Sequence, residues 1–113
     1  FVSQFEHSLF VLATVMSAAK PGRVVVDAGL KSMAFDSGLP SVQEPAGAEY
    51  SRPSDEHGRI DPGSSNAKLG LGDRVRLIPG HCDPTVNLHD WYVAVRDGVV
   101  EEVWRVDARG ALF

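Results

Sequence analysis

A β-hairpin signal at residues 91–106 constrains the fold more than any other feature of the sequence. Two runs of β-branched and aromatic residues flank the pair Asp97-Gly98, which supplies the two positive φ angles that a type I′ turn requires. Simple alternation along the second run predicts that Trp104 and Val106 share a face of the hairpin with Val100. The chain therefore contains at least one pair of antiparallel strands.

Shorter runs elsewhere also have the pattern of strands. Residues 8–17 are apolar at nearly every position, which is typical of a strand buried on both faces, although a short buried helix has the same pattern. Residues 23–26 contain three consecutive valines and are expected to form a central strand. Residues 71–79 combine a Gly-Asp turn with an alternating strand that places Val75 and Leu77 on one face.

The remaining segments are rich in glycine and proline and predict connections. Residues 27–45 are expected to be a loop with room for one helical turn, and residues 49–51 a short strand. Gly29 is expected to adopt a positive φ. Residues 52–67 are expected to form a poorly ordered surface connection. The whole pattern predicts a mostly β fold, a small β-barrel or sandwich with little helix.

Composition and charge place the chain among ordinary globular domains. Its 113 residues, 43% hydrophobic and 23% charged, suit a single domain with a modest core. The net charge is −4 and the basic residues are scattered, which argues against nucleic-acid binding. No run approaches the roughly 20 apolar residues that would span a membrane. The single Cys82 can form no internal disulfide and favours a reducing, cytoplasmic setting.

The densest cluster of chemically active residues lies at residues 80–90, directly after a predicted strand. If the backbone stays extended, His81 and Asp83 point the same way and Cys82 points away from them. An imidazole and a carboxylate on one side can bind one divalent cation, and this pair suits Zn²⁺ or Mn²⁺, with Mg²⁺ as a further option. Two protein ligands leave coordination positions open, which is typical of a catalytic site.

Each of these residues also has an ordinary structural interpretation. A His-x-Asp pair is usually a hydrogen-bonded turn, and a buried cysteine is most often a small hydrophobic residue. His89 is expected to be structural rather than a ligand. Residue chemistry alone leaves metal binding and a structural turn both open. Turn and cap positions suit the other polar residues of the segment, which are Thr85, Asn87 and Asp90.

The segment 79–91 closely resembles the metal-site signature of the D-threonine aldolase family. That family is related to the D-serine dehydratases and, more distantly, to the alanine racemases. Other stretches match the family in the same order, so the resemblance covers nearly the whole chain. These stretches are Gln4-Phe5-Glu6, Thr14-Val15-Met16-Ser17, Val26-Asp27-Ala28-Gly29-Leu30-Lys31, Asp36-Ser37-Gly38-Leu39-Pro40 and Ser54-Asp55-Glu56-His57-Gly58.

The resemblance implies that two domains share the chemistry. Family members pair an (α/β)₈ barrel, which carries pyridoxal phosphate on a Schiff-base lysine, with a β-domain. Residues 1–113 resemble the β-domain only, and the sequence begins at Phe1 rather than Met, so we expect an excerpt of a longer enzyme that is inactive on its own. The cofactor lysine would belong to the N-terminal barrel. The lysines of this chain are therefore expected at the surface, namely Lys20, Lys31 and Lys68.

The resemblance also assigns His81 and Asp83 as ligands of a divalent metal. In the dehydratase branch a cysteine takes the second position, so Asp83 favours an aldolase that cleaves β-hydroxy-D-amino acids such as D-threonine or 3-hydroxy-D-aspartate. The products would be glycine, or another amino acid, and an aldehyde. The metal would lower the pKa of the substrate hydroxyl, and pyridoxal phosphate would accept the electrons left on Cα. The alternative is a D-serine dehydratase-like ammonia lyase, which releases a keto acid and ammonia.

Further expectations concern the surroundings of this site. His57 either lines the site or holds its loop through a hydrogen bond. Because surfaces between domains are partly apolar, an exposed apolar patch should lie beside the His81 loop. The resemblance further implies a homodimer in which barrel and β-domain pack together. A non-catalytic β-barrel interaction module is the alternative from another class of protein.

Overall fold

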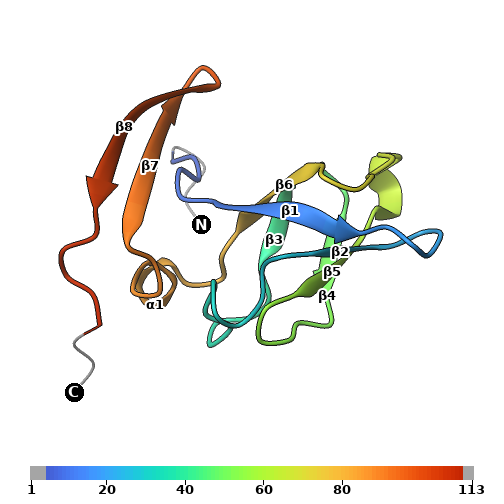
Figure 1. Cartoon of the computed structure of the whole chain (residues 1–113), viewed down its shortest axis with the longest axis horizontal. Helices are drawn as coiled ribbons and strands as arrows, with labels where there is room; N and C mark the ends of the chain where they lie inside the picture. The colour runs from blue at the N-terminus through green and yellow to red at the C-terminus, as the bar shows by residue number, and fades with distance from the viewer. Residues whose placement is uncertain (1–4, 111–113) are drawn as a thin grey trace.

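Six antiparallel strands form one curved sheet that almost closes into a barrel, and two more strands form a separate hairpin (Figure 1). The computed structural model describes residues 5–110. Its elements are β1 Val11–Ser17, β2 Val24–Val26, β3 Ser41–Glu44, β4 Glu49–Ser51, β5 Gly58–Asp61, the 3₁₀ turn η1 Gly63–Ser65, β6 Arg74–Ile78, α1 Cys82–Val86, β7 Trp91–Arg96 and β8 Val99–Arg105. The strand order in the large sheet is β3-β6-β1-β2-β5-β4. The predicted mostly β fold is confirmed.

The hydrophobic core lies inside this curved sheet. Val75 and Leu77 of β6 are fully buried on one face, as their spacing predicts. Met33, from the connection between β2 and β3, is fully buried too, so that connection packs into the barrel and not over its surface. The remaining core side chains are Ala13, Val15, Val24, Val26, Ala28, Ala48, Tyr50 and Ile60.

The prediction for residues 52–67 is wrong, because this segment contains an inner strand of the sheet. β5 pairs with β2 on one side and β4 on the other, and Ile60 is fully buried. Gly58 weakens the strand signal, but the packing requires it, since a Cβ there would lie 2.2 Å from the ring of Tyr50. Burial of that ring raises the pKa of Tyr50 to about 12.

Residues 27–40 form a connection, as predicted. The last part of the predicted loop at residues 27–45 is instead the edge strand β3, which was not predicted. The expected helical turn is a single hydrogen-bonded turn, in which Met33 N donates to Gly29 O at 3.2 Å. Gly29 does not adopt the expected positive φ. A glycine is required there for a different reason, because an added Cβ would lie 2.3 Å from Ser54 O.

Strand β1 is buried on one face only, whereas its apolar sequence predicted burial on both. Ala13 and Val15 point into the core, while Leu12 and Met16 on the outer face remain 60% and 53% exposed. Both edges of β1 are paired, with β6 and with β2. The uniform hydrophobicity therefore reflects an outer apolar face that nothing covers within residues 5–110.

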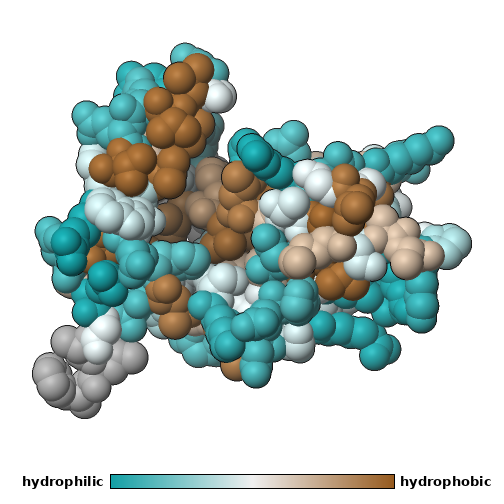
Figure 2. All heavy atoms as spheres, in the orientation of Figure 1, coloured by the Kyte–Doolittle hydropathy of each residue, from teal (hydrophilic) through white to brown (hydrophobic). Residues whose placement is uncertain are grey.

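The hairpin β7–β8 projects away from the barrel (Figure 1), and its turn has the predicted form. Asp97 and Gly98 have φ angles of 52° and 76°. Both strands are largely exposed although they are rich in apolar residues, and Figure 2 shows apolar side chains along the length of the hairpin. The exposed large apolar residues are Trp91, Tyr92, Val93, Val95, Val99, Val100, Val103 and Trp104.

A β-bulge in the hairpin overturns one detail of the prediction. Val100 pairs with Val95, whereas Trp104 pairs with Tyr92, and the register shifts between these two pairs. Val95 and Tyr92 lie on opposite faces of β7 because side chains alternate along a strand. Val100 and Trp104 therefore lie on opposite faces as well, and simple alternation fails because the bulge adds one residue to β8.

Candidate metal site

His81 lies where the chain leaves β6 and enters the short helix α1. Its backbone is extended (φ −146°, ψ 120°) and forms the N-cap of the helix, and Asp83 lies in the first helical turn. The condition for the predicted common orientation of His81 and Asp83, an extended backbone, is not met beyond His81, since the helix begins at Cys82. Pro84 favours this outcome, because the first turn of a helix tolerates a residue without an N–H group. Across residues 5–110, no helix is long and apolar enough to cross a membrane.

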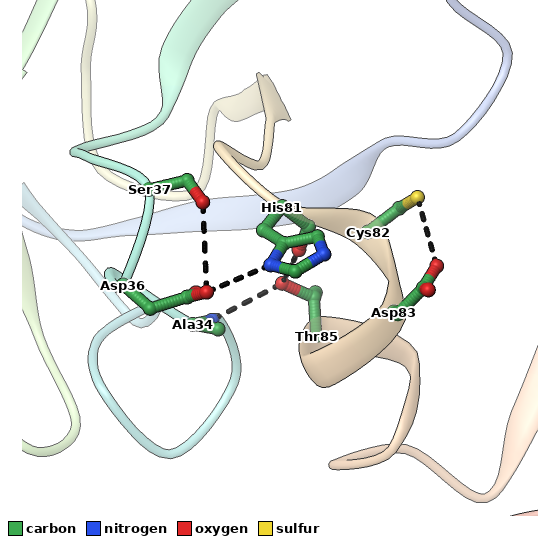
Figure 3. A network of polar contacts seen from close by, with 7 residues as sticks. All are labelled: Ala34, Asp36, Ser37, His81, Cys82, Asp83 and Thr85. Carbon is green, nitrogen blue, oxygen red and sulfur yellow. Dashed lines mark hydrogen bonds and ion pairs between the residues drawn. The ribbon is translucent and has the colours of Figure 1, made fainter.

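Asp36 contacts the imidazole ring of His81, although 45 positions separate the two residues (Figure 3). The Nδ1 atom of His81 and the Oδ2 atom of Asp36 are 2.7 Å apart. This hydrogen bond lowers the pKa of Asp36 and raises the pKa of His81. An ionised carboxylate only accepts, so Nδ1 carries the proton and the neutral ring keeps a free lone pair on Nε2.

Asp83 lies on the other side of the His81 ring from Asp36 (Figure 3). The negative charge of the Asp83 carboxylate is the smallest of the contributions to the raised pKa of His81. The Cys82 thiol donates to Asp83 Oδ1 at 3.4 Å. The thiol is exposed, so Cys82 is not the small buried residue of the structural interpretation and does not point away from Asp83.

An apolar depression of about 350 Å³ adjoins Cys82 and Asp83. Its position confirms the prediction that exposed apolar surface lies beside the His81 loop. The depression reaches from the N-terminal segment to the base of the hairpin. The other lining residues are Leu9, Val86, Tyr92 and Ala108.

Thr85 joins the loop that carries Asp36 to the helix that follows His81. Its hydroxyl accepts from Ala34 N at 3.1 Å and donates to His81 O at 2.7 Å. Thr85 is only 2% exposed and is the one buried polar residue of the described chain. Its role is therefore more specific than the cap or turn role predicted for it, because it ties together both sides of the Asp36–His81 pair.

Two further contacts join the same segments. His89 donates from Nε2 to Ser32 O at 2.7 Å, which confirms its predicted structural role. At the other end, a Cβ on Gly80 would lie 2.7 Å from Gly38 O, so the two backbones pack in direct contact. The loop at residues 32–38 is thus fixed against residues 80–89 at both ends and in the middle.

The His81 imidazole and the Asp83 carboxylate are a nitrogen and an oxygen donor that suit a borderline or hard divalent cation. Within residues 5–110, no group of three or more His, Cys, Asp or Glu side chains is arranged to hold a metal ion. A cation bound by His81 and Asp83 would therefore need further ligands from water, substrate or another part of the protein.

His57 lies in a different depression, of about 430 Å³. Its backbone holds the loop, because Ser54 N donates to His57 O at 2.8 Å and His57 N donates to Ser54 Oγ at 3.3 Å. The second of the two roles predicted for His57, holding its loop, is therefore carried out by its backbone atoms. The depression is strongly basic, and its other lining residues are Arg23, Val25, Arg52, Gly58 and Arg59.

The other polar residues singled out in the sequence have structural roles. Asn87 accepts from Gly110 N at 2.7 Å through its side-chain oxygen, and Asp90 pairs with Arg109 at 3.1 Å. Asp27, which belongs to one of the stretches that match the family, accepts from Thr14 N at 2.8 Å. The lysines are all at the surface, as predicted, and they are Lys20, Lys31 and Lys68.

The chain is a small β-domain, a nearly closed barrel that carries a histidine and an aspartate at a strand-to-helix junction. Residues 8–95 match the family described as "Putative serine dehydratase domain", and the chain belongs to that family.

Two curated relatives are identical to the chain at about half of the aligned positions. The 3-hydroxy-D-aspartate aldolase of Paracoccus denitrificans is 53% identical over 107 residues, which is 95% of this chain and 27% of the aldolase. The D-threonine aldolase of an Arthrobacter species is 53% identical over 108 residues, covering 94% of this chain and 28% of that enzyme. The chain thus spans little more than a quarter of the length of these relatives.

Solved structures give the same relationship. The D-threonine aldolase of Filomicrobium marinum superimposes with a TM-score of 0.87 and 45% identity, over 96% of this chain and 30% of that one. The D-threo-3-hydroxyaspartate dehydratase of Delftia sp. HT23 gives a TM-score of 0.69 and 28% identity, over 89% and 32%. Two mutants of a dehydratase of that name have also been solved. In one a cysteine is replaced by alanine, and that structure is of the metal-free form; in the other a histidine is replaced by alanine. The histidine lies two positions before the cysteine in that enzyme.

Proposed function

We propose that this chain is the metal-bearing β-domain of a pyridoxal-phosphate-dependent aldolase that cleaves β-hydroxy-D-amino acids. Two aldolases at 53% identity, each several times longer than the chain, support this proposal. The cofactor would sit on an N-terminal barrel domain that the chain itself does not include. On this account residues 1–113 form one domain of a longer enzyme.

His81 and Asp83 are the proposed metal ligands, and the Asp36–His81 hydrogen bond is the observation that carries the assignment. A histidine that binds a metal usually donates its other ring N–H to a carboxylate or carbonyl. His81 has this arrangement, with Nδ1 engaged by Asp36 at 2.7 Å and Nε2 left as the donor atom. Asp83 lies two positions after His81, and the histidine and cysteine that were mutated in the solved dehydratase are separated by the same two positions.

The donor set fits a site with open positions. Bound there, Mn²⁺, Zn²⁺ or Mg²⁺ would supply a Lewis acid for the substrate hydroxyl, while pyridoxal phosphate on the barrel would supply an electron sink. Asp83 would add a negative charge that strengthens cation binding, and its exposed position leaves room for a substrate. The apolar depression beside Asp83 would exclude water once another domain covered it.

An aldolase is favoured over a dehydratase because the residue at the second ligand position is Asp83 and the closer relatives are aldolases. The family description and the Delftia enzyme keep a dehydratase as the second candidate. Product analysis separates them. With full-length protein, pyridoxal phosphate, Mn²⁺ and D-threonine or 3-hydroxy-D-aspartate, an aldolase releases glycine and an aldehyde. Keto acid and ammonia would reject the aldolase assignment, and no turnover of either kind would favour a non-catalytic module.

The exposed apolar surfaces support packing against other parts of a larger enzyme. Uncovered apolar side chains occur on the hairpin, on the outer face of β1 and in the depression beside Asp83. Surfaces of this kind are typical of interfaces. We propose that these surfaces face a barrel domain, which belongs either to the same subunit or to the second subunit of a homodimer. A cytoplasmic location is proposed on the exposed, unpaired thiol of Cys82.

A further inference from the structure

We infer that Asp36 is a positioning residue that determines which ring nitrogen of His81 is available to a metal ion. The inference rests on the proposed metal site, and it adds a residue from a distant part of the chain. Asp36 does not act as a ligand in this account. It accepts the Nδ1–H bond and thereby directs the Nε2 lone pair toward the side on which Asp83 lies (Figure 3).

The geometry determines the tautomer. A neutral imidazole has one N–H donor and one acceptor nitrogen, and the partner of one nitrogen decides the state of the other. The carboxylate of Asp36 can only accept, and it lies 2.7 Å from Nδ1. The alternative tautomer would place two lone pairs against each other at that distance. Only the tautomer with a free Nε2 satisfies the contact.

The loop that carries Asp36 is held in place, which distinguishes this pair from an ordinary surface ion pair. The side chains of Asp36 and His81 are 54% and 43% exposed, so the pair alone would contribute little to folding. However, the hydroxyl of buried Thr85 bonds to Ala34 N, two residues before Asp36. The same hydroxyl also bonds to the carbonyl oxygen of His81. The contact is therefore part of the fold.

The first test measures the tautomer without a metal. Full-length protein labelled with ¹⁵N-histidine is compared with Asp36→Ala, and the His81 signals are assigned from their absence in His81→Ala. Above the pKa of the ring, we expect the wild-type protein to carry its proton on Nδ1. Asp36→Ala should show the Nε2-protonated form or a mixture. Asp36→Asn, which keeps a carbonyl acceptor, should retain more of the Nδ1-protonated form than Asp36→Ala.

The second test measures Mn²⁺ and Zn²⁺ affinity by competition with a chromophoric chelator. Loss of an outer-shell partner typically weakens metal binding about 10- to 100-fold, and we expect a loss in that range for Asp36→Ala. His81→Ala should lose the site. Glu101→Ala is the matched control, because it removes an exposed acid that pairs with Arg96, at 3.4 Å, on the distant hairpin. It should leave both the tautomer and the affinity unchanged.

The two tests separate the inference from the function on which it rests. An unchanged His81 tautomer in Asp36→Ala, or unchanged metal affinity in that variant while His81→Ala loses the site, would overturn the role of Asp36. Equal metal affinity in wild type and His81→Ala would instead overturn the proposed metal site. A tautomer that shifts in Asp36→Ala together with weakened metal binding supports both.

Discussion

At the scale of single residues, the contact between Asp36 Oδ2 and His81 Nδ1, at 2.7 Å, joins two segments that are far apart in the sequence. His81 and Asp83 could be singled out because their side-chain types and spacing suggest a shared cation. Asp36 could not, because 45 positions separate it from His81 and the sequence places it in an ordinary loop. Only the path of the chain brings the two side chains together. Thr85 was predicted as a cap for the same reason, since its second partner is Ala34.

Gly58 is a residue whose importance lies in packing and not in catalysis. An Ala side chain there would place its Cβ 2.2 Å from the ring of Tyr50, which is buried and bonded through its hydroxyl to Ala28 O. Gly58→Ala should therefore destabilise the fold by about 1–3 kcal/mol, the usual cost of overpacking. The measurement is chemical denaturation.

Gly70→Ala is the control for that prediction. Its added Cβ would meet only Asp73 Oδ2, at 3.8 Å, and Gly70 has no positive φ. Its effect should be small. Equal stabilities for the two variants would show that the close packing of Gly58 against Tyr50 is wrong.

At the scale of elements, strands with a clear alternating pattern were predicted correctly, whereas elements that depend on pairing with distant strands were missed. The alternation in β6 and the Asp97-Gly98 turn gave correct predictions because each depends on adjacent residues. β5 was missed because Gly58 and the prolines around it resemble a loop, and only pairing on both edges makes it a strand. The helix α1 was missed because five residues are too few for a helical period.

Thr85 links the Asp36 loop to α1, and its hydroxyl can be tested directly. Thr85→Val keeps the shape but leaves Ala34 N and His81 O without their partner. An unsatisfied buried group costs about 1–3 kcal/mol, so we expect a loss of that size in the free energy of unfolding. The amide of Ala34 should also exchange faster with solvent.

Ser37→Ala is the matched control, since Ser37 is exposed and its hydroxyl makes only a 3.5 Å contact with Asp36. It should change stability by less than Thr85→Val. If Thr85→Val were as stable as wild type with a protected Ala34 amide, the proposed link between the two segments would be wrong.

At the scale of the whole molecule, the chain presents apolar surface that its own core does not use. The hairpin, the outer face of β1 and the depression beside Asp83 are all uncovered. Burial on both faces of β1 was predicted from composition, and that prediction fails within residues 5–110. The proposed barrel domain, if it covers these surfaces, would explain both the apolar sequence of β1 and the exposure of its outer face.

The isolated chain should therefore have no aldolase activity. We expect residues 1–113, supplied with pyridoxal phosphate, Mn²⁺ and D-threonine, to release no acetaldehyde above the rate without protein. Circular dichroism should verify that the chain is folded. Turnover on the order of 1 per second or faster would show that a second domain is unnecessary.

The most direct test of the central claim is the effect of Asp83→Ala on metal and cofactor in the full-length protein. The substitution removes a ligand and a negative charge together, so metal affinity and aldehyde release should each fall by more than the roughly 100-fold expected from loss of an outer-shell partner. Pyridoxal phosphate content and its absorbance band should be unchanged, because the proposed cofactor site lies on the barrel domain and not on this one. Asp90→Ala, which removes a nearby exposed acid paired with Arg109, should retain metal and activity. An Asp83→Ala enzyme with wild-type activity that a chelator still abolishes would contradict the account, because the metal would then be bound by other ligands.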